Sequence, residues 1–277
     1  MPLFPSHRRF RKCVLTVSAA LMLTGAFAGV AHAAVIDLTL EGSDAIWLAG
    51  RTDLVIPPAS APWPLGLVRH GGPTPEEIQE TMPPGVGISA GDVIRVLDPA
   101  TGGISFFNGF GAPLYGPEGN PGNSNITAFG GISGYIGTQG ALVGVFLTDA
   151  VPAALPPPTL DFSPGGLGKE FLTLSPVIGQ VFYIGNGVTS GNVYQEFMAP
   201  ASATRVFFGI TDAFGFGGAP GAFDDNDGSY RIRVGINEVP TSPTAVPEPA
   251  TLTLLGLGMS ALGYARKRSS RGTRRTP

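Results

Sequence analysis

The sequence predicts an all-β protein whose main domain is a single antiparallel β-sandwich. The chain has 41 glycines and 27 prolines among 277 residues, so turn-forming residues interrupt it at short intervals. Between these residues lie short apolar or alternating runs that are rich in β-branched and aromatic side chains. Strand-sized runs with regular turn signals are typical of a sandwich.

Six of these runs have the length and composition of strands. They are Val35–Leu40, Asp92–Leu97, Ala141–Leu147, Gln180–Ile184, Arg205–Ile210 and Tyr230–Ile236. Only Pro75–Glu80 has a helical pattern, because a proline occupies its first turn and acidic residues follow. Apolar runs flank Pro152–Pro158 on both sides, which favours a long loop within one domain over an interdomain linker.

The N-terminus has the pattern of a secretory signal peptide. Four basic residues between Arg8 and Lys12 precede an apolar stretch from Val14 to Val30, and small residues occupy Ala31 and Ala33. We therefore expect a signal helix in residues 1–33 and cleavage by signal peptidase before Ala34. Cys13 is the only cysteine, so the mature domain would have no disulfide and no thiolate site.

The C-terminus contains Val246, Pro247, Glu248 and Pro249, then an apolar run from Ala250 to Ala265, then Arg266-Lys267-Arg268. A helix of this run would be roughly 24 Å long, against about 30 Å for the bilayer core. Its glycines lower helix propensity, and the basic residues after it favour a cytoplasmic end. A short transmembrane helix that holds the chain temporarily is therefore favoured, and a permanent single-pass anchor is the alternative.

These C-terminal features, in this order, resemble the PEP-CTERM sorting signal of exported proteins from Gram-negative bacteria. The resemblance implies recognition and removal of the tail by an exosortase-type membrane protease. It further implies transient inner-membrane anchoring and then delivery to the cell surface or extracellular matrix, where extracellular polysaccharide is an expected neighbour.

The predicted organisation is a signal peptide (1–33), a β-sandwich domain (34–240), a linker with the Pro-Glu-Pro motif (241–249), a transmembrane sorting helix (250–265) and a basic cytoplasmic tail (266–277). Four of the 17 basic residues precede residue 34 and six follow residue 245, which leaves seven. Nineteen of the 20 acidic residues lie between these limits, so the segment 34–245 has a net charge of -12. Such an acidic domain disfavours nucleic acid as a partner and favours divalent cations.

One acidic turn is the strongest candidate for cation binding. Asp224, Asp225, Asn226 and Asp227 occupy successive positions, and their charges repel one another unless a cation or water screens them. Ca²⁺ prefers six to eight oxygen ligands, which this turn could begin to supply. The pattern does not fit an EF-hand, because Phe223 and Val234 fall at positions where that motif needs acidic ligands. An ordinary tight turn between strands is the alternative interpretation.

A longer series of short motifs resembles the small calcium-dependent galactose-binding lectins of Gram-negative bacteria. The motifs follow one another between Gly91 and Ile236, and they include Tyr115-Gly116-Pro117-Glu118-Gly119 and Phe197-Met198-Ala199-Pro200. The resemblance implies a jelly-roll sandwich of the galactose-binding-domain type. It also implies a Ca²⁺ site made by the carbonyl oxygen of Tyr115 and the side chains of Asp212, Asp225 and Asn226.

The sequence departs from that lectin pattern in two places. The histidine expected after the Gly-Pro-Glu-Gly segment is absent from Asn120–Phe129, and a longer insert, Ala213–Ala222, separates the two strands that would hold the metal. Fold and metal could therefore be retained without galactose specificity.

Patterns for enzymatic activity are weak. His70 is the only histidine after the signal peptide, the chain has no G-x-S-x-G motif, and Lys169 is not part of a phosphate-binding loop. Glu76, Glu77 and Glu80 are better explained as acidic residues near a helix N-terminus than as a general acid and base. We therefore expect a non-enzymatic exported protein, either a structural or matrix protein stabilised by calcium or a calcium-dependent carbohydrate-binding module.

Overall fold

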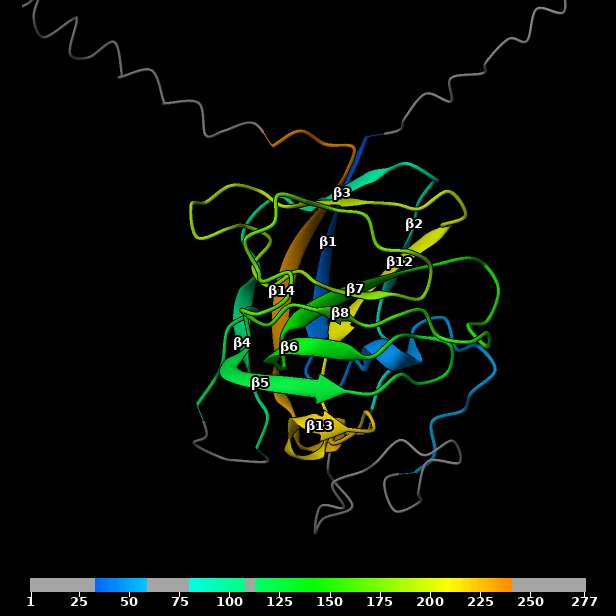
Figure 1. Ribbon diagram of the computed structural model, residues 1–277, viewed down its shortest axis with the longest axis vertical. Helices are drawn as coiled ribbons and strands as arrows, with labels where there is room; N and C mark the ends of the chain where they lie inside the picture. The colour runs from blue at the N-terminus through cyan, green and yellow to red at the C-terminus, as the bar shows by residue number, and fades with distance from the viewer. Residues whose placement is uncertain (1–32, 59–79, 108–112, 241–277) are drawn as a thin grey trace, which may run out of the picture. The chain divides into compact units, whose positions relative to one another are not determined.

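The computed structural model describes residues 33–58, 80–107 and 113–240, which are almost entirely strands, turns and loops. Figure 1 shows strands β1 (Ala34–Glu41) and β14 (Asp227–Ile236) side by side along the domain. They pair antiparallel over their whole common length, from Ala34 opposite Ile236 to Glu41 opposite Ser229. The all-β prediction is confirmed.

The strands form three sheets. The first has the order β1, β14, β3 (Val93–Val96), β11 (Glu196–Met198) and β9 (Thr173–Leu174), with β4 (Thr101–Ser105) also paired to β14. The second has the order β10 (Val181–Tyr183), β7 (Leu142–Leu147), β12 (Arg205–Ile210) and β2 (Gly85–Gly87). The third has the order β13 (Gly217–Gly218), β5 (Asn120–Ile126), β6 (Tyr135–Gln139) and β8 (Leu160–Asp161).

Short 3-10 turns are the only helical elements within the described ranges. They are η1 (Ile46–Leu48), η2 (Phe214–Phe216) and η3 (Phe223–Asp225). No helix in these ranges is long and apolar enough to span a membrane. The expected signal helix, the sorting helix and nearly all of the expected helix Pro75–Glu80 lie outside the described residues.

All six predicted strands are present, as β1, β3, β7, β10, β12 and β14. The arrangement differs from a single antiparallel sandwich, because there are three sheets and β9–β11, β5–β13 and β6–β8 pair in parallel. The parallel partners are two-residue strands at sheet edges, joined by long loops. A hydrophobic pattern predicts that a run is extended, but it does not predict its pairing partner.

One apolar core joins the sheets. On β14, Tyr230, Ile232 and Val234 are buried, whereas Arg231 and Arg233 between them are exposed. The buried side chains belong to the same cluster as Val143 of β7 and other side chains of the second sheet. Alternation from Tyr230 to Val234 therefore gives this part of the first sheet one face in the core and one face in solvent.

Trp47 lies in this core and not in a binding surface. Its side chain has no exposed area, and its indole Nε1–H donates a 2.9 Å hydrogen bond to the carbonyl oxygen of Ser133. A buried indole needs such a partner, so Trp47 has a structural role.

Candidate cation site

The candidate site lies between the end of β12 and the start of β14. Asp212 follows β12 in the second sheet, and Asn226 precedes β14 in the first. The insert between them returns on itself, because the N–H of Gly221 donates a 3.1 Å hydrogen bond to the carbonyl oxygen of Asp212. The long insert therefore does not separate the two predicted ligand positions.

Asp212 and Asn226 are almost completely buried, with exposed fractions of 2% and 1%. Asp212 Oδ1 accepts a 2.7 Å hydrogen bond from the N–H of Ala213, and Asn226 Nδ2 donates a 3.0 Å hydrogen bond to the carbonyl of Gly42. The other oxygen of each side chain, Asp212 Oδ2 and Asn226 Oδ1, has no hydrogen-bond partner in the structure. Buried acceptors without a donor are rare in folded proteins and call for a proton, a water or an ion.

The electrostatic setting of Asp212 supports this view. Burial raises the pKa of Asp212 well above its ordinary value, and the charges of Asp225 and Asp224 raise the pKa further. The neighbouring amide of Asn226 and the N–H of Ala213 act in the opposite direction and do not compensate. Burial therefore disfavours the ionised form of Asp212, and a positive charge beside the carboxylate would favour that form.

Three of the four predicted ligand residues, Asp212, Asp225 and Asn226, thus lie in one neighbourhood. Tyr115, the fourth predicted ligand, makes hydrogen bonds within the fold. Its carbonyl oxygen accepts a 2.9 Å hydrogen bond from the N–H of Ile104 and a 3.3 Å hydrogen bond from the hydroxyl of Tyr230. The single hydroxyl proton of Tyr230 lies nearer to the carbonyl oxygen of Gly116, at 2.9 Å, so the bond from Ile104 is the firm one and a metal bond from Tyr115 stays a prediction.

The donor set is suited to a hard cation but is incomplete by itself. Within the described ranges, no three side chains of His, Cys, Asp and Glu are placed to hold a metal ion together. A cation beside Asp212 would depend on the amide oxygen of Asn226 and on water in addition to carboxylates. Ca²⁺ accepts such mixed oxygen ligands, so the metal role of these residues stays a prediction.

Two further polar residues of this region were not among the four predicted ligands. Thr211 has no exposed area and its hydroxyl has no hydrogen-bond partner in the structure. Asp224 is buried and adds to the negative field at Asp212. Asp224 belongs to the predicted acidic turn, but nothing in the sequence indicates that its side chain is buried.

Two further groups of predicted residues come from the sequence alone. They are the signal residues Ala31 and Ala33 and the sorting residues Val246, Pro247, Glu248 and Pro249. Of these, only Ala33 falls among the described residues, directly before Ala34 at the start of β1. Residues 245–269 match the PEP-CTERM protein-sorting motif, which confirms the predicted sorting signal. The motif marks the chain as an exported protein that is processed by an exosortase, a membrane protease.

Neither the curated proteins nor the solved structures contain a match to this chain. The lectin resemblance of Gly91–Ile236 therefore has no support from them.

Proposed function

Because the chain carries an exosortase sorting motif, we propose that it is a non-enzymatic structural protein of the cell surface or extracellular matrix, and that calcium stabilises its exported domain. The signal peptide and the short sorting helix would hold it transiently in the inner membrane of a Gram-negative bacterium. Signal peptidase and the exosortase would then release the acidic domain.

The observation that carries the calcium part of this proposal is the pair Asp212 Oδ2 and Asn226 Oδ1. Both are buried oxygens without a donor, and they lie beside the charges of Asp224 and Asp225. A divalent cation would bind the two oxygens and offset the unfavourable burial of the Asp212 charge. Because such a cation binds the folded chain, it would stabilise the domain against unfolding.

Thermal unfolding of the purified protein tests this directly. Extracellular calcium modules have Kd values of about 10⁻⁴ to 10⁻³ M, and calcium at ten times Kd would stabilise the fold by about 1.4 kcal/mol. We expect the melting temperature to be roughly 3 °C higher in excess Ca²⁺ than in chelator. An equal melting temperature in both, with no calcium by elemental analysis, would show that the domain binds none. Hydrolase activity on polysaccharide would contradict the non-enzymatic assignment.

The second candidate is a calcium-dependent carbohydrate-binding module. The grouping of Asp212, Asp225 and Asn226 favours it, because a metal held there could accept sugar hydroxyls. The absence of a histidine from Asn120–Phe129 favours the structural role instead. Glycan-array binding that is lost in Asp225→Ala would reverse this order, while glycan binding that survives this substitution would point to another surface.

A further inference from the structure

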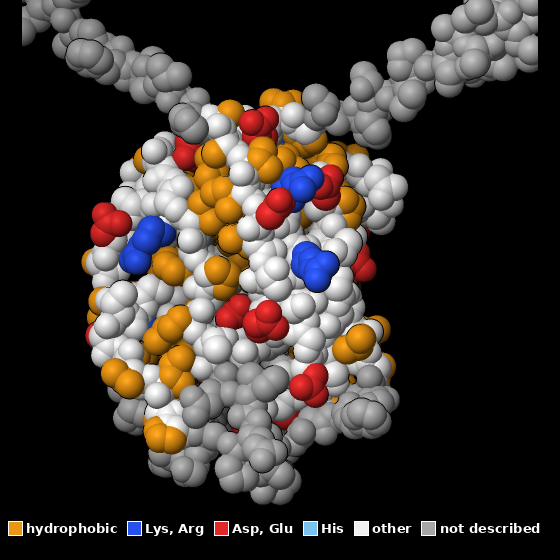
Figure 2. Space-filling view, turned by 180° about the vertical axis from the view of Figure 1, so that it is seen from behind, with side chains coloured by type: hydrophobic (Ala, Val, Ile, Leu, Met, Phe, Trp, Pro, Cys, Tyr) orange, Lys and Arg blue, Asp and Glu red, His pale blue; other side chains and the backbone are white. Residues whose placement is uncertain are grey.

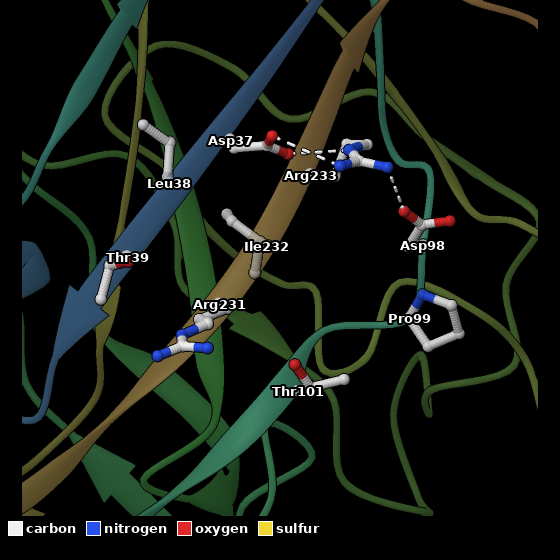
Figure 3. A pocket seen from close by; sticks show the side chains of 9 residues that line it. All are labelled: Asp37, Leu38, Thr39, Asp98, Pro99, Thr101, Arg231, Ile232 and Arg233. Atoms are coloured by element: carbon white, nitrogen blue, oxygen red, sulfur yellow. Dashed lines mark hydrogen bonds and ion pairs between the residues drawn. The ribbon is translucent and has the colours of Figure 1, made fainter.

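A polar groove crosses the solvent face of the first sheet, away from the residues of the cation site. It consists of two adjoining hollows of about 350 and 450 Å³, both bordered by Asp37, Asp98 and Arg233. We call it the β1–β14 groove, because its floor is formed by these two strands. Figure 3 shows the first hollow with its side chains, and Figure 2 shows acidic and basic side chains close together on the surface seen from behind.

The middle of the groove is a solvent-exposed charge network. Arg233 Nε lies 2.7 Å from Asp37 Oδ1, and Arg233 Nη1 lies 2.8 Å from Asp98 Oδ2 (Figure 3). One guanidinium therefore holds two carboxylates in place on segments that are distant in sequence. These exposed carboxylates still have lone pairs available, which can accept hydrogen bonds from hydroxyl groups.

Arg231 stands at one end of the groove and is not neutralised. It lies opposite Thr39 on β1 and opposite Thr101 on β4, and its side chain is exposed. Within the described part of the chain it has no ion pair and no hydrogen bond, in contrast to Arg233 (Figure 3). A guanidinium flanked by two hydroxyl side chains is suited to a carboxylate, which it can bind through two parallel hydrogen bonds.

The other end of the groove combines apolar side chains with the carboxylate of Glu238. Its lining includes Val35, Leu97, Tyr194, Val239 and Pro240. The ring of Tyr194 offers an apolar face together with a polar hydroxyl. This end can therefore cover the C–H face of a ring that makes hydrogen bonds at its edge.

The spacing of these features suits a chain of rings. Arg231 and Arg233 are two residues apart on one face of β14, so their side chains start about 7 Å apart, which is comparable to one sugar ring. The domain as a whole is strongly acidic. An anionic polymer is therefore repelled less when neutral units space its charges than when every unit carries one.

We propose that the β1–β14 groove binds a polysaccharide in which uronic acid residues alternate with neutral sugars. Arg231 binds the uronate carboxylate between Thr39 and Thr101. Asp37 and Asp98 accept hydrogen bonds from the hydroxyls of the next ring, and Tyr194 covers a further ring. This site is independent of calcium, because it shares no residue with the cation site.

Calorimetric titration of the full-length protein, purified in mild detergent, tests the proposal. The probes are hyaluronan oligosaccharides, which alternate glucuronate and N-acetylglucosamine, and the same oligosaccharides after chemical reduction of their carboxylates to alcohols. Chelator is present throughout, so that failure of the calcium proposal does not affect the result. We expect the acidic oligosaccharide to bind and Arg231→Gln to weaken binding by about tenfold or more, because a charge-assisted pair is lost.

The control variant is Lys169→Gln, which removes the same charge outside the groove and should leave affinity unchanged. For the wild-type protein, reduction of the carboxylates should weaken binding about as much as the substitution Arg231→Gln does. For the Arg231→Gln variant, the same reduction should weaken binding little further, because the partner of the carboxylate is already absent. If Arg231→Gln and Lys169→Gln weakened binding equally, the effect would come from net charge alone and the proposal would be overturned. It would also be overturned by an absence of binding to the wild-type protein, or by equally tight binding of a peptide of alternating glutamate and glycine.

Discussion

The side-chain amide of Asn226 donates a 3.0 Å hydrogen bond to the carbonyl oxygen of Gly42, 184 residues earlier in the chain. This bond joins the start of β14 to the turn that follows β1, and it uses an N–H of the amide. The oxygen of the same amide is left without a donor, as is Asp212 Oδ2. The contact thus fixes which atom of Asn226 is available to a cation.

Asp212→Asn should raise stability in chelator and remove the response to calcium. The substitution keeps the shape of the side chain, deletes a charge whose burial is unfavourable, and supplies an N–H for a neighbouring acceptor. We expect a gain of about 1 kcal/mol, or roughly 2–4 °C in melting temperature without calcium. Lower stability of Asp212→Asn in chelator would mean that the fold needs the carboxylate itself.

Trp47→Phe should destabilise the domain by about 2 kcal/mol, since it leaves the buried carbonyl of Ser133 without its donor and removes part of a fully buried ring. Urea unfolding followed by circular dichroism would measure the loss. Val35→Ala is the control, because Val35 is 49% exposed and its truncation should change stability far less. Equal effects of the two substitutions would contradict the placement of Trp47 in the core.

Gly140→Ala should be strongly destabilising. Gly140 has a φ of +62°, and a Cβ atom there would lie 2.1 Å from Cζ of Phe106. Phe106 is buried and stacks on Tyr115, so it cannot easily move. We expect a loss of about 2–4 kcal/mol from the backbone conformation and the clash together. The control is Gly165→Ala, where a Cβ would meet nothing within 4 Å and where stability should hardly change.

The carboxyl of Asp37 should titrate below its ordinary pKa. The hydrogen bond from Arg233 lowers the pKa of Asp37, desolvation opposes it, and the charge of the guanidinium lowers the pKa further. A lowered pKa in the folded state stabilises the fold above the pKa of the unfolded chain, and this stabilisation disappears as the pH falls through the lower, folded value. Carbon-detected NMR titration should show the Asp37 pKa rising towards 3.8 in Arg233→Gln and staying low in Arg95→Gln.

Replacement of Pro247, Glu248 and Pro249 by alanine should leave the tail attached. The replacement destroys the sorting motif within residues 245–269 and leaves the apolar run and the basic cluster intact. Mass spectrometry of the cellular protein should detect the C-terminal peptides in this variant but not in the wild type. The control is Thr241→Ala, which lies outside the matched motif and should be processed normally.

Much of the fold could be predicted because strands such as Arg205–Ile210 and Tyr230–Ile236 have the β-branched, aromatic and alternating composition of half-buried sheet. By contrast, β5 has the sequence Asn-Pro-Gly-Asn-Ser-Asn-Ile, which reads as a turn. It is a strand because β6 supplies antiparallel partners on one side, with an irregular register between Asn120 and Asn123 that accommodates Pro121 and Gly122. Local propensity cannot predict such a strand, since the stabilisation comes from the partner.

The candidate site was predictable in its residue types and only in part in its geometry. The acidic turn and Asp212 stand out in sequence as carboxylates at strand ends. The insert between them closes because the N–H of Gly221 donates a hydrogen bond to the carbonyl oxygen of Asp212, and the sequence does not reveal this bond. The use of the Tyr115 carbonyl by Ile104 and Tyr230 is likewise a tertiary contact that no spacing of residues reveals.

The sequence by itself determined that this protein is exported and sorted by an exosortase, because a sorting motif is read as a short linear stretch. It also determined the all-β class, since alternation and turn residues act locally. Only the tertiary structure decided that Asp212 and Asn226 are buried side by side and that Arg231, alone beside the paired Arg233, faces an open groove. Burial, pairing and the pKa of a carboxylate depend on which strands meet across the sheets, and those encounters bring together residues far apart in the chain.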